Sequence, residues 1–165
     1  MKQPNQEELR PRKYMLVTSR GGHLDHLLAL EGLWKGGPRC WVTYASSKSR
    51  EHDLAGETVF FCPYPVEHDS MQGWFNFARG MILAFRLIRR ERPSLIFSTG
   101  AGCAVPFFLV GRILGVTTCF MEVYDRVSSS TATGRAASFL CNYTFVQWPC
   151  QKALYPRAHL VGELY

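Results

Sequence analysis

The sequence has 165 residues, about the length of one domain, which is enough to bury a core but short for an enzyme that holds two large substrates. With 19 Lys and Arg against 13 Asp and Glu, the net charge of +6 indicates an anionic partner without choosing among nucleic acid, a lipid surface and a phosphorylated ligand. We expect neither a signal peptide nor a membrane-spanning helix, because the polar N-terminus has no apolar h-region and no window holds roughly 18 to 20 consecutive apolar residues.

The predicted elements alternate between strands and helices after a flexible polar arm at residues 1–13. Short apolar runs rich in β-branched and aromatic residues predict strands at 14–19, 40–45, 58–65, 94–98, 117–123, 143–147 and 158–162. Apolar residues at helical spacing predict helices at 23–35, 71–92, 103–114 and 132–140. This alternation favours an α/β fold with a Rossmann-like, doubly wound parallel sheet, in a single domain from residue 14 to residue 165.

Glycine loops follow the first and the fourth predicted strands, as "SRGGH" and "STGAGC". In a doubly wound sheet the strand order usually reverses between these two strands, and ligands sit there beyond the strand ends. Each loop opens a helix, whose unpaired N–H groups and positive dipole end suit a phosphate or pyrophosphate. The sequence therefore predicts an anion site made by Arg20, Gly21, Gly22, Thr99, Gly100, Ala101 and Gly102.

His23 lies in the first turn of the helix after the first loop. A helix N-terminus disfavours the imidazolium, so the ring stays neutral and is suited to act as a general base. The alternative is that His23 only makes a structural hydrogen bond at the helix start. His26, one turn later, is expected to be an ordinary surface or groove residue.

Glu122 ends the fifth predicted strand, and a polar loop with Asp125 and Arg126 follows it. The end of this strand faces the same crevice, so Glu122 is a candidate to accept hydrogen bonds from sugar hydroxyls and Arg126 to meet a phosphate. The alternatives are a helix cap for Glu122 and a salt bridge within the loop for Arg126.

The long helix at 71–92 carries apolar residues on more than one side. Its 3.6-residue period predicts a core stripe of Met71, Trp74, Phe75, Ala78, Met81, Ile82, Phe85 and Ile88. Outside that stripe lies a predicted membrane-contact face, a basic row flanking two leucines: Arg79, Leu83, Arg86, Leu87 and Arg90. Such a face is typical of a helix that rests on an anionic bilayer. A protein partner over the leucines, or a solvated face, are the alternatives.

Several other chemistries have weaker support. The six cysteines include no CxxC pair and most sit in apolar runs, so we expect reduced core thiols and no metal site. An NADP-binding oxidoreductase is a lesser alternative, because Ser46, Ser47, Lys48 and Arg50 follow the second strand, although the GxGxxG spacing is absent. Nucleic-acid binding has only the net charge in its favour, and we expect neither that partner nor a cofactor.

An ordered set of motifs carries a family resemblance from Tyr14 to the C-terminus. The motifs are "SRGGHL", "CPYP", "RRERPSLIFSTGAGCAVPFFLVGRILGVTTCFMEVYDRV", "TGRAA" and "FVQWP" followed by "LYPRAHLVGEL". They resemble bacterial capsule and exopolysaccharide glycosyltransferase subunits, which are akin to the membrane-anchoring subunit of the eukaryotic dolichol-linked N-acetylglucosaminyltransferase. More distantly, the two glycine loops look like those in the N-terminal half of the enzyme that adds N-acetylglucosamine to the lipid-linked peptidoglycan precursor.

The resemblance implies a GT-B glycosyltransferase split between two polypeptides. This chain would be the N-terminal, acceptor-binding half, inactive on its own, and a partner subunit would hold the UDP-sugar. The implied acceptor is a polyprenyl-diphosphate-linked saccharide at the inner face of the cytoplasmic membrane, where the chain would be a peripheral protein. By similarity His23 takes the place of the base, Gly21, Gly22, Gly100 and Gly102 cradle the diphosphate, and Glu122 is the acid after strand five.

Two features of the sequence depart from the family pattern. Arg20 stands where relatives often have a small residue, and the N-terminal membrane helix of the eukaryotic relatives is absent from this sequence. The expected function is transfer of a sugar from a UDP-sugar to the lipid-linked acceptor in polysaccharide biosynthesis. The alternative is a non-catalytic membrane scaffold that stimulates the donor-binding subunit.

Overall fold

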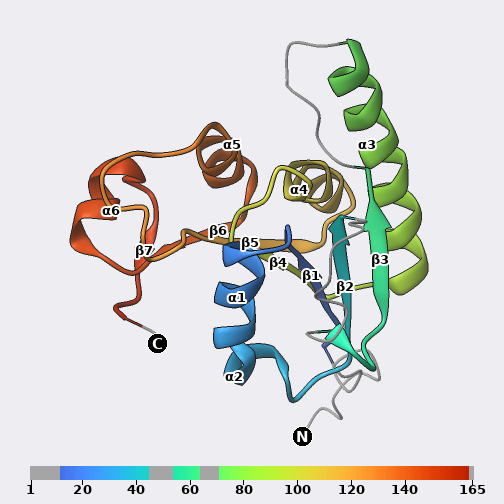
Figure 1. Ribbon diagram of the computed structural model, residues 1–165, viewed down its shortest axis with the longest axis horizontal. Coiled ribbons are helices and arrows are strands. Elements are labelled where there is room, and N and C mark those ends of the chain that lie inside the picture. The colour runs from blue at the N-terminus through green and yellow to red at the C-terminus, as the bar shows by residue number, and fades with distance from the viewer. Residues whose placement is uncertain (1–11, 45–53, 64–70, 164–165) are drawn as a thin grey trace, which may run out of the picture.

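The computed structural model of the chain describes residues 12–44, 54–63 and 71–163. Its strands form one parallel seven-stranded sheet in the order β3-β2-β1-β4-β5-β6-β7 (Figure 1). The strands are β1 Tyr14–Val17, β2 Arg39–Tyr44, β3 Val59–Cys62, β4 Leu95–Ser98, β5 Thr117–Met121, β6 Tyr143–Val146 and β7 His159–Leu160. The order reverses between β1 and β4, which confirms the predicted doubly wound sheet and its switch point.

Helices cover both faces of the sheet. The helices are α1 Gly22–Ala29, α2 Glu31–Trp34, α3 Met71–Glu91, α4 Ala104–Ile113, α5 Ala132–Leu140 and α6 Pro149–Leu154. In Figure 1, α1 and α2 lie on one face of the sheet, and α4 and α5 lie on the other. The strands therefore bury side chains on both sides and read as continuous apolar runs, as in β1, where Met15 and Val17 enter one core and Leu16 the other.

The predicted helix at 23–35 is divided into α1 and α2. Leu30, between them, has φ −88° and ψ 19°, outside the helical region, and Leu33 donates its N–H to the Leu30 carbonyl. The short helix α6 was not predicted. It has six residues and begins at Pro149, so it offers too few turns for a periodic pattern to stand out.

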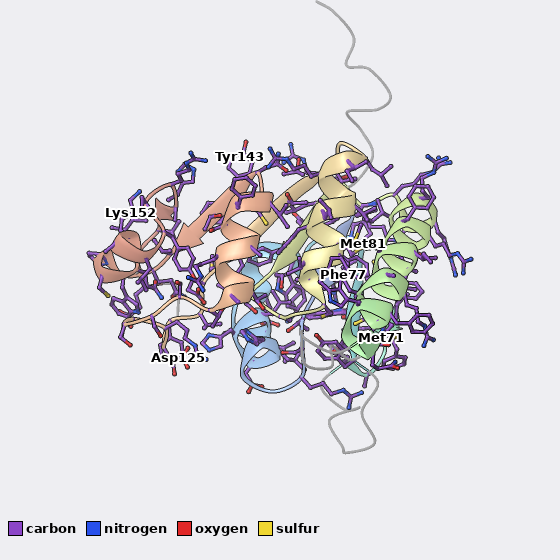
Figure 2. The ribbon with its side chains drawn as sticks, turned by 90° about the horizontal axis from the view of Figure 1, so that it is seen from above. Met71, Phe77, Met81, Asp125, Tyr143 and Lys152 are labelled. Atoms are coloured by element: carbon purple, nitrogen blue, oxygen red, sulfur yellow. The ribbon has the colours of Figure 1, made fainter. Side chains whose placement is uncertain are left out.

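Helix α3 packs on α4 through a face that the predicted core stripe includes only in part, at Met81 and Ile88. The buried residues of α3 are Gly80, Ala84, Leu87 and Ile88, and a Cβ on Gly80 would lie 3.2 Å from Cγ of Pro106 in α4. Small residues decide this face, because they let the two helix backbones approach closely. Figure 2 shows Phe77 and Met81 on the side of α3 toward α4.

Two predictions about α3 are therefore wrong. Leu87 is only 5% exposed and the half-buried Leu83 packs on the core, so neither belongs to a free surface. Most of the predicted core stripe instead faces outward, and we call these residues the outward apolar face of α3: Met71, Trp74, Phe75, Ile82 and Phe85. Exposed arginines accompany it, at Arg79, Arg86, Arg89 and Arg90. Among the described residues, no helix has the length and apolar character needed to span a bilayer.

Candidate functional site

The loops after β1 and β4 meet at the carboxyl edge of the sheet. These strands are hydrogen-bonded neighbours, so the first turn of α1 comes to lie beside the loop that opens α4. Two hydrogen bonds join the loops: the Thr99 hydroxyl donates to the His23 carbonyl over 2.8 Å, and His23 Nδ1 bonds the Thr99 carbonyl over 3.1 Å. The two glycine loops thus lie side by side in space.

The bond to Thr99 fixes the state of the His23 ring. A carbonyl oxygen only accepts hydrogen bonds, so the proton of a neutral His23 ring lies on Nδ1 and the lone pair lies on Nε2. Burial is the main cause that lowers the pKa of His23 below its ordinary value of 6.5, and His26 lowers it further, whereas the Thr99 bond and Asp125 oppose the shift. A neutral ring with a free Nε2 lone pair is the form that a general base requires.

Two glycines with positive φ shape the loops, and one of them lies against the His23 ring. Gly100 has a φ of +102°, and a Cβ there would lie 3.2 Å from the ring of Phe120 and 3.4 Å from Cε1 of His23. The His23 ring therefore lies directly against the second loop. Gly21 has a φ of +85° and precedes α1, whose N-terminus no side chain caps.

The second loop keeps two backbone donors available. Gly100 N–H donates to the Ser98 hydroxyl over 3.1 Å, and Cys103 N–H donates to the Tyr44 hydroxyl over 2.7 Å. The N–H groups of Ala101 and Gly102, between them, have no acceptor in the described part of the chain. Successive N–H groups at a helix start form a site suited to an anion.

Arg20 adds a cation at the start of the first loop. Its Nη1 atom is buried and has no hydrogen-bond partner within the ranges that the structure describes. A buried donor without an acceptor carries a free-energy cost of about 1–3 kcal/mol. The role predicted for Arg20 in binding an anion stays a prediction.

Glu122 is buried inside the protein at the end of β5. The residue is 2% exposed, its Oε1 accepts the Val123 N–H over 3.1 Å, and its Oε2 accepts the hydroxyl of Tyr155. Burial is the main cause that raises its pKa. With both oxygens engaged inside the protein, the predicted contact with a sugar has no support, and Glu122 instead holds the end of β5 to the C-terminal segment.

The loop after β5 reaches the His23 site through other residues. The rings of His26 and Tyr124 lie 4.7 Å apart, and the charges of Asp125 and Arg126 act on His23. Arg126 is exposed, so it is open to solvent at this loop. The sequence analysis missed both Tyr124 and Tyr155, and no spacing marks them, since Tyr155 meets Glu122 across 33 positions of the chain.

Two further points concern the residues after β2 and the side chains that could ligate a metal. The residues named for an NADP phosphate, Ser46, Ser47, Lys48 and Arg50, lie outside the described residues. Within the described ranges, no group of three or more His, Cys, Asp or Glu side chains is arranged to hold a metal ion. The cysteines described there are free thiols, and all but Cys150 are buried.

Curated proteins similar to this chain share one description. The sequence is 30% identical to human UDP-N-acetylglucosamine transferase subunit ALG14, over an alignment that covers 91% of this chain and 82% of the human protein. The rat protein of the same description is 27% identical with the same coverage. No protein-family model matches the sequence.

Solved structures match the fold. Acinetobacter baumannii MurG superposes with a TM-score of 0.68 and 17% identity, over 84% of this chain and 42% of MurG. Staphylococcus aureus MnaA in complex with UDP has a TM-score of 0.70 and 9% identity, over 93% of this chain and 44% of MnaA. The chain thus spans less than half the length of these structures. At such low identity the likeness concerns the fold alone, and it confirms the predicted Rossmann-like fold of the GT-B glycosyltransferases.

Proposed function

Because the chain belongs to the family of the ALG14 subunits of UDP-N-acetylglucosamine transferase, we propose that it is the acceptor-binding subunit of a two-component glycosyltransferase. A separate donor-binding subunit supplies the UDP-sugar. The acceptor is a polyprenyl-diphosphate-linked saccharide, and the pair works in bacterial capsule or exopolysaccharide synthesis at the inner face of the cytoplasmic membrane. The chain alone does not transfer sugar.

The observation that carries this proposal is the His23 ring held against the Gly100 loop. The bond from Nδ1–H to the Thr99 carbonyl leaves the lone pair of the neutral ring on its other nitrogen, Nε2. Nε2 takes the proton from the acceptor hydroxyl, the hydroxyl oxygen bonds the anomeric carbon of the UDP-sugar, and the bond from that carbon to UDP breaks. Positioning of the acceptor supplies much of the acceleration.

The diphosphate of the acceptor binds where backbone and side-chain donors converge. Support comes from the N-terminus of α1 and from three groups that have no partner among the described residues: the N–H groups of Ala101 and Gly102 and the Nη1 atom of Arg20. Arg126, on the exposed loop after β5, is the further cation that we assign to the phosphates.

The outward apolar face of α3 contacts the membrane. Arginines border its aromatic rings: Cζ of Arg79 lies 5.7 Å from the ring centre of Phe75, and Cζ of Arg89 lies 5.5 Å from that of Phe85. An interfacial helix combines apolar rings that enter the lipid with cations that meet anionic headgroups. This face replaces the one predicted around the two leucines.

The test is sugar transfer by a reconstituted pair. The candidate donor-binding subunit is assayed alone and with this chain, with UDP-N-acetylglucosamine as the first donor and polyprenyl-diphosphate-linked saccharides as acceptors. The proposal expects turnover only from the pair. A full rate from the donor-binding subunit alone would refute it and favour the scaffold alternative.

A further inference from the structure

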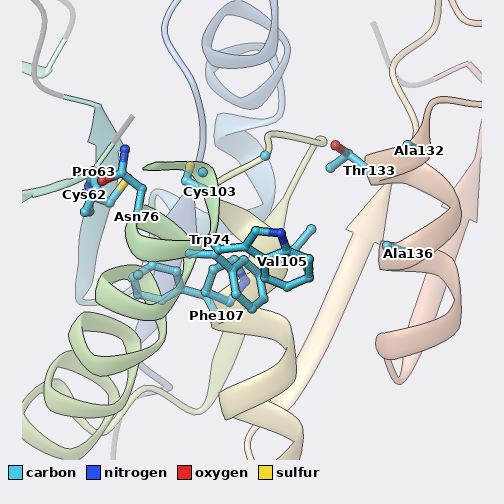
Figure 3. A pocket seen from close by; sticks show the side chains of 15 residues that line it. Cys62, Pro63, Trp74, Asn76, Cys103, Val105, Phe107, Ala132, Thr133 and Ala136 are labelled. Carbon is cyan, nitrogen blue, oxygen red and sulfur yellow. The ribbon is translucent and has the colours of Figure 1, made fainter. Parts of the chain in front are cut away.

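An apolar pocket lies between α3, α4 and α5 at the carboxyl edge of the sheet (Figure 3). Its volume is about 460 Å³, within the roughly 300–1,000 Å³ range of small-molecule sites. Aromatic and aliphatic side chains from α3 and α4 form much of it: Trp74, Phe77, Val105, Pro106 and Phe107. Neither the mechanism nor the membrane contact described above uses this space.

The pocket adjoins the second glycine loop, after β4, which we call the anion loop because we assign the diphosphate to it. Gly102 and Cys103, the last residues of the second glycine loop, form part of its wall. At the opposite side, Ala132, Thr133 and Ala136 present small side chains from the first turns of α5, and Figure 3 shows this wall across from Val105. A ligand with a diphosphate on the loop would therefore have its next atoms at the pocket.

The pocket is continuous with the outward apolar face of α3. Trp74 belongs to both, because it lines the pocket and is 70% exposed. A chain that fills the pocket would pass this ring and reach the surface that we assign to the membrane. Anion site, pocket and outward face thus follow one another in space.

The chemistry of the lining selects a hydrocarbon. None of the lining residues carries a charge, and Asn76, one of the few polar ones, already accepts a hydrogen bond from Gln72 over 3.2 Å. A peptide in this space would bury backbone N–H and C=O groups without partners, which is costly. An isoprenoid chain has no polar groups to satisfy.

Resting on the proposed function, we propose that this pocket binds the first isoprene units of the lipid carrier. The anion loop holds the diphosphate, the pocket holds the adjoining part of the chain, and the remainder passes Trp74 into the bilayer. The chain therefore contributes to acceptor affinity through direct contact with the protein, besides keeping the acceptor in the membrane.

The test compares ligands that differ only in the hydrocarbon. Binding of farnesyl diphosphate, inorganic pyrophosphate and farnesol to the full chain is measured by isothermal titration calorimetry. The proposal expects farnesyl diphosphate to bind at least tenfold more tightly than pyrophosphate. Val105→Trp, which fills the pocket, removes this gain and leaves pyrophosphate binding unchanged, whereas Ile113→Trp, at the exposed far end of the same helix, retains it.

A second substitution that fills the pocket tests the proposal in case Val105→Trp does not fold. Gly73→Leu adds a side chain at the pocket wall from the first turn of α3, where leucine also favours the helix. Equal affinity for farnesyl diphosphate and pyrophosphate, or a gain that survives both filling variants, would overturn the pocket assignment. If pyrophosphate does not bind while farnesol and farnesyl diphosphate bind equally well, the result refutes the diphosphate site of the proposed function and supports the pocket.

Discussion

The hydroxyl of Tyr155, close to the end of the chain, donates a hydrogen bond to the buried carboxylate of Glu122 at the end of β5. The first turn of α5 covers this pair, because a Cβ on Gly134 would meet the Tyr155 hydroxyl and lie 2.9 Å from Oε2 of Glu122. Three segments that are distant in the sequence are thus joined beneath the loop that reaches His23.

Gly134→Ala is expected to lower the free energy of unfolding by about 1–3 kcal/mol, as overpacking of a buried site does. The new methyl group displaces the Tyr155 hydroxyl and breaks its bond to Glu122. Urea denaturation measures the change. Gly32→Ala, in α2 with open space around it, is the control and gains up to about 1 kcal/mol from helix propensity. Equal stability of Gly134→Ala and wild type would show that the pair tolerates displacement.

Glu122→Gln is expected to stabilise the protein increasingly as pH rises. Burial raises the pKa of Glu122, so folding favours its neutral form. The stability that this preference contributes is complete below the unfolded pKa of about 4.3 and is lost as pH rises through the higher folded pKa. The amide of Gln stays neutral at every pH, so the variant does not lose this stability as pH rises. Unfolding free energies of both proteins between pH 4 and pH 8 give the comparison, and a pH-independent difference would contradict the raised pKa.

His23→Ala is expected to lower turnover of the reconstituted pair by about 10²–10⁴-fold, the usual contribution of a general base. Because burial lowers the pKa of His23, wild-type turnover should rise through a pH below 6.5 and level off above it. In the His23→Ala variant turnover no longer rises over this acidic range, the acidic limb of the profile, while the two subunits remain associated. His26→Ala serves as the control: it keeps the limb and moves it to a higher pH, since His26 depresses the pKa of His23. An unchanged profile in His23→Ala would remove His23 from the base role.

Arg20→Met is expected to weaken pyrophosphate binding about tenfold and to raise the unfolding free energy by about 1 kcal/mol. The substitution removes a buried donor that has no partner among the described residues, so the folded protein becomes more stable. The same change removes a donor to pyrophosphate, so the affinity falls. Calorimetry and urea denaturation measure the two effects. Arg112→Met is the control, since Arg112 bonds the Leu140 carbonyl at the far end of α4 and should leave pyrophosphate affinity unchanged. A loss of both stability and affinity would mean that Arg20 is structural.

Ile82→Ser is expected to weaken binding to phosphatidylglycerol vesicles about tenfold, because one apolar side chain of this size contributes about 1.5 kcal/mol when buried. Binding should also fall with added salt, since the arginines beside this residue meet the anionic headgroups. Vesicle co-sedimentation measures both effects. Phe139→Ser, on α5 and 75% exposed, should bind as wild type does. Equal loss in the two variants would place the membrane contact elsewhere.

The sequence predicted the sheet well because its strands are buried on both faces. Runs such as Met15, Leu16 and Val17 have no polar interruptions, and the glycine loops mark the two strands that meet at the switch point. The meeting of His23 with Gly100 followed from that topology alone. Its hydrogen bond to Thr99 did not, because spacing does not reveal which nitrogen faces a carbonyl.

The sequence-based prediction was wrong where the size of the side chains decided the packing more than their hydrophobicity did. In α3 the helical period was correct and Ile88 is buried as predicted, but most of the predicted core stripe was wrong. Phe75, Ile82 and Phe85 outweigh Gly80 and Ala84 on any apolar scale. Close contact with α4 requires the small residues, so the large ones turn outward. The predicted sugar contact of Glu122 lacks support for a different reason. Its carboxylate is bonded by Tyr155, which comes later in the chain, and no local sequence pattern reports such a partner.

The register of the two central strands has a consequence for how the protein folds. Tyr14 lies opposite Leu95, so the middle of the sheet closes only after the ribosome has released the chain as far as β4. Such non-local pairing makes folding slow and leaves apolar strand edges exposed to aggregation meanwhile. The two glycine loops follow these strands and come together at the same late step, so the proposed anion site forms only when the centre of the sheet is complete.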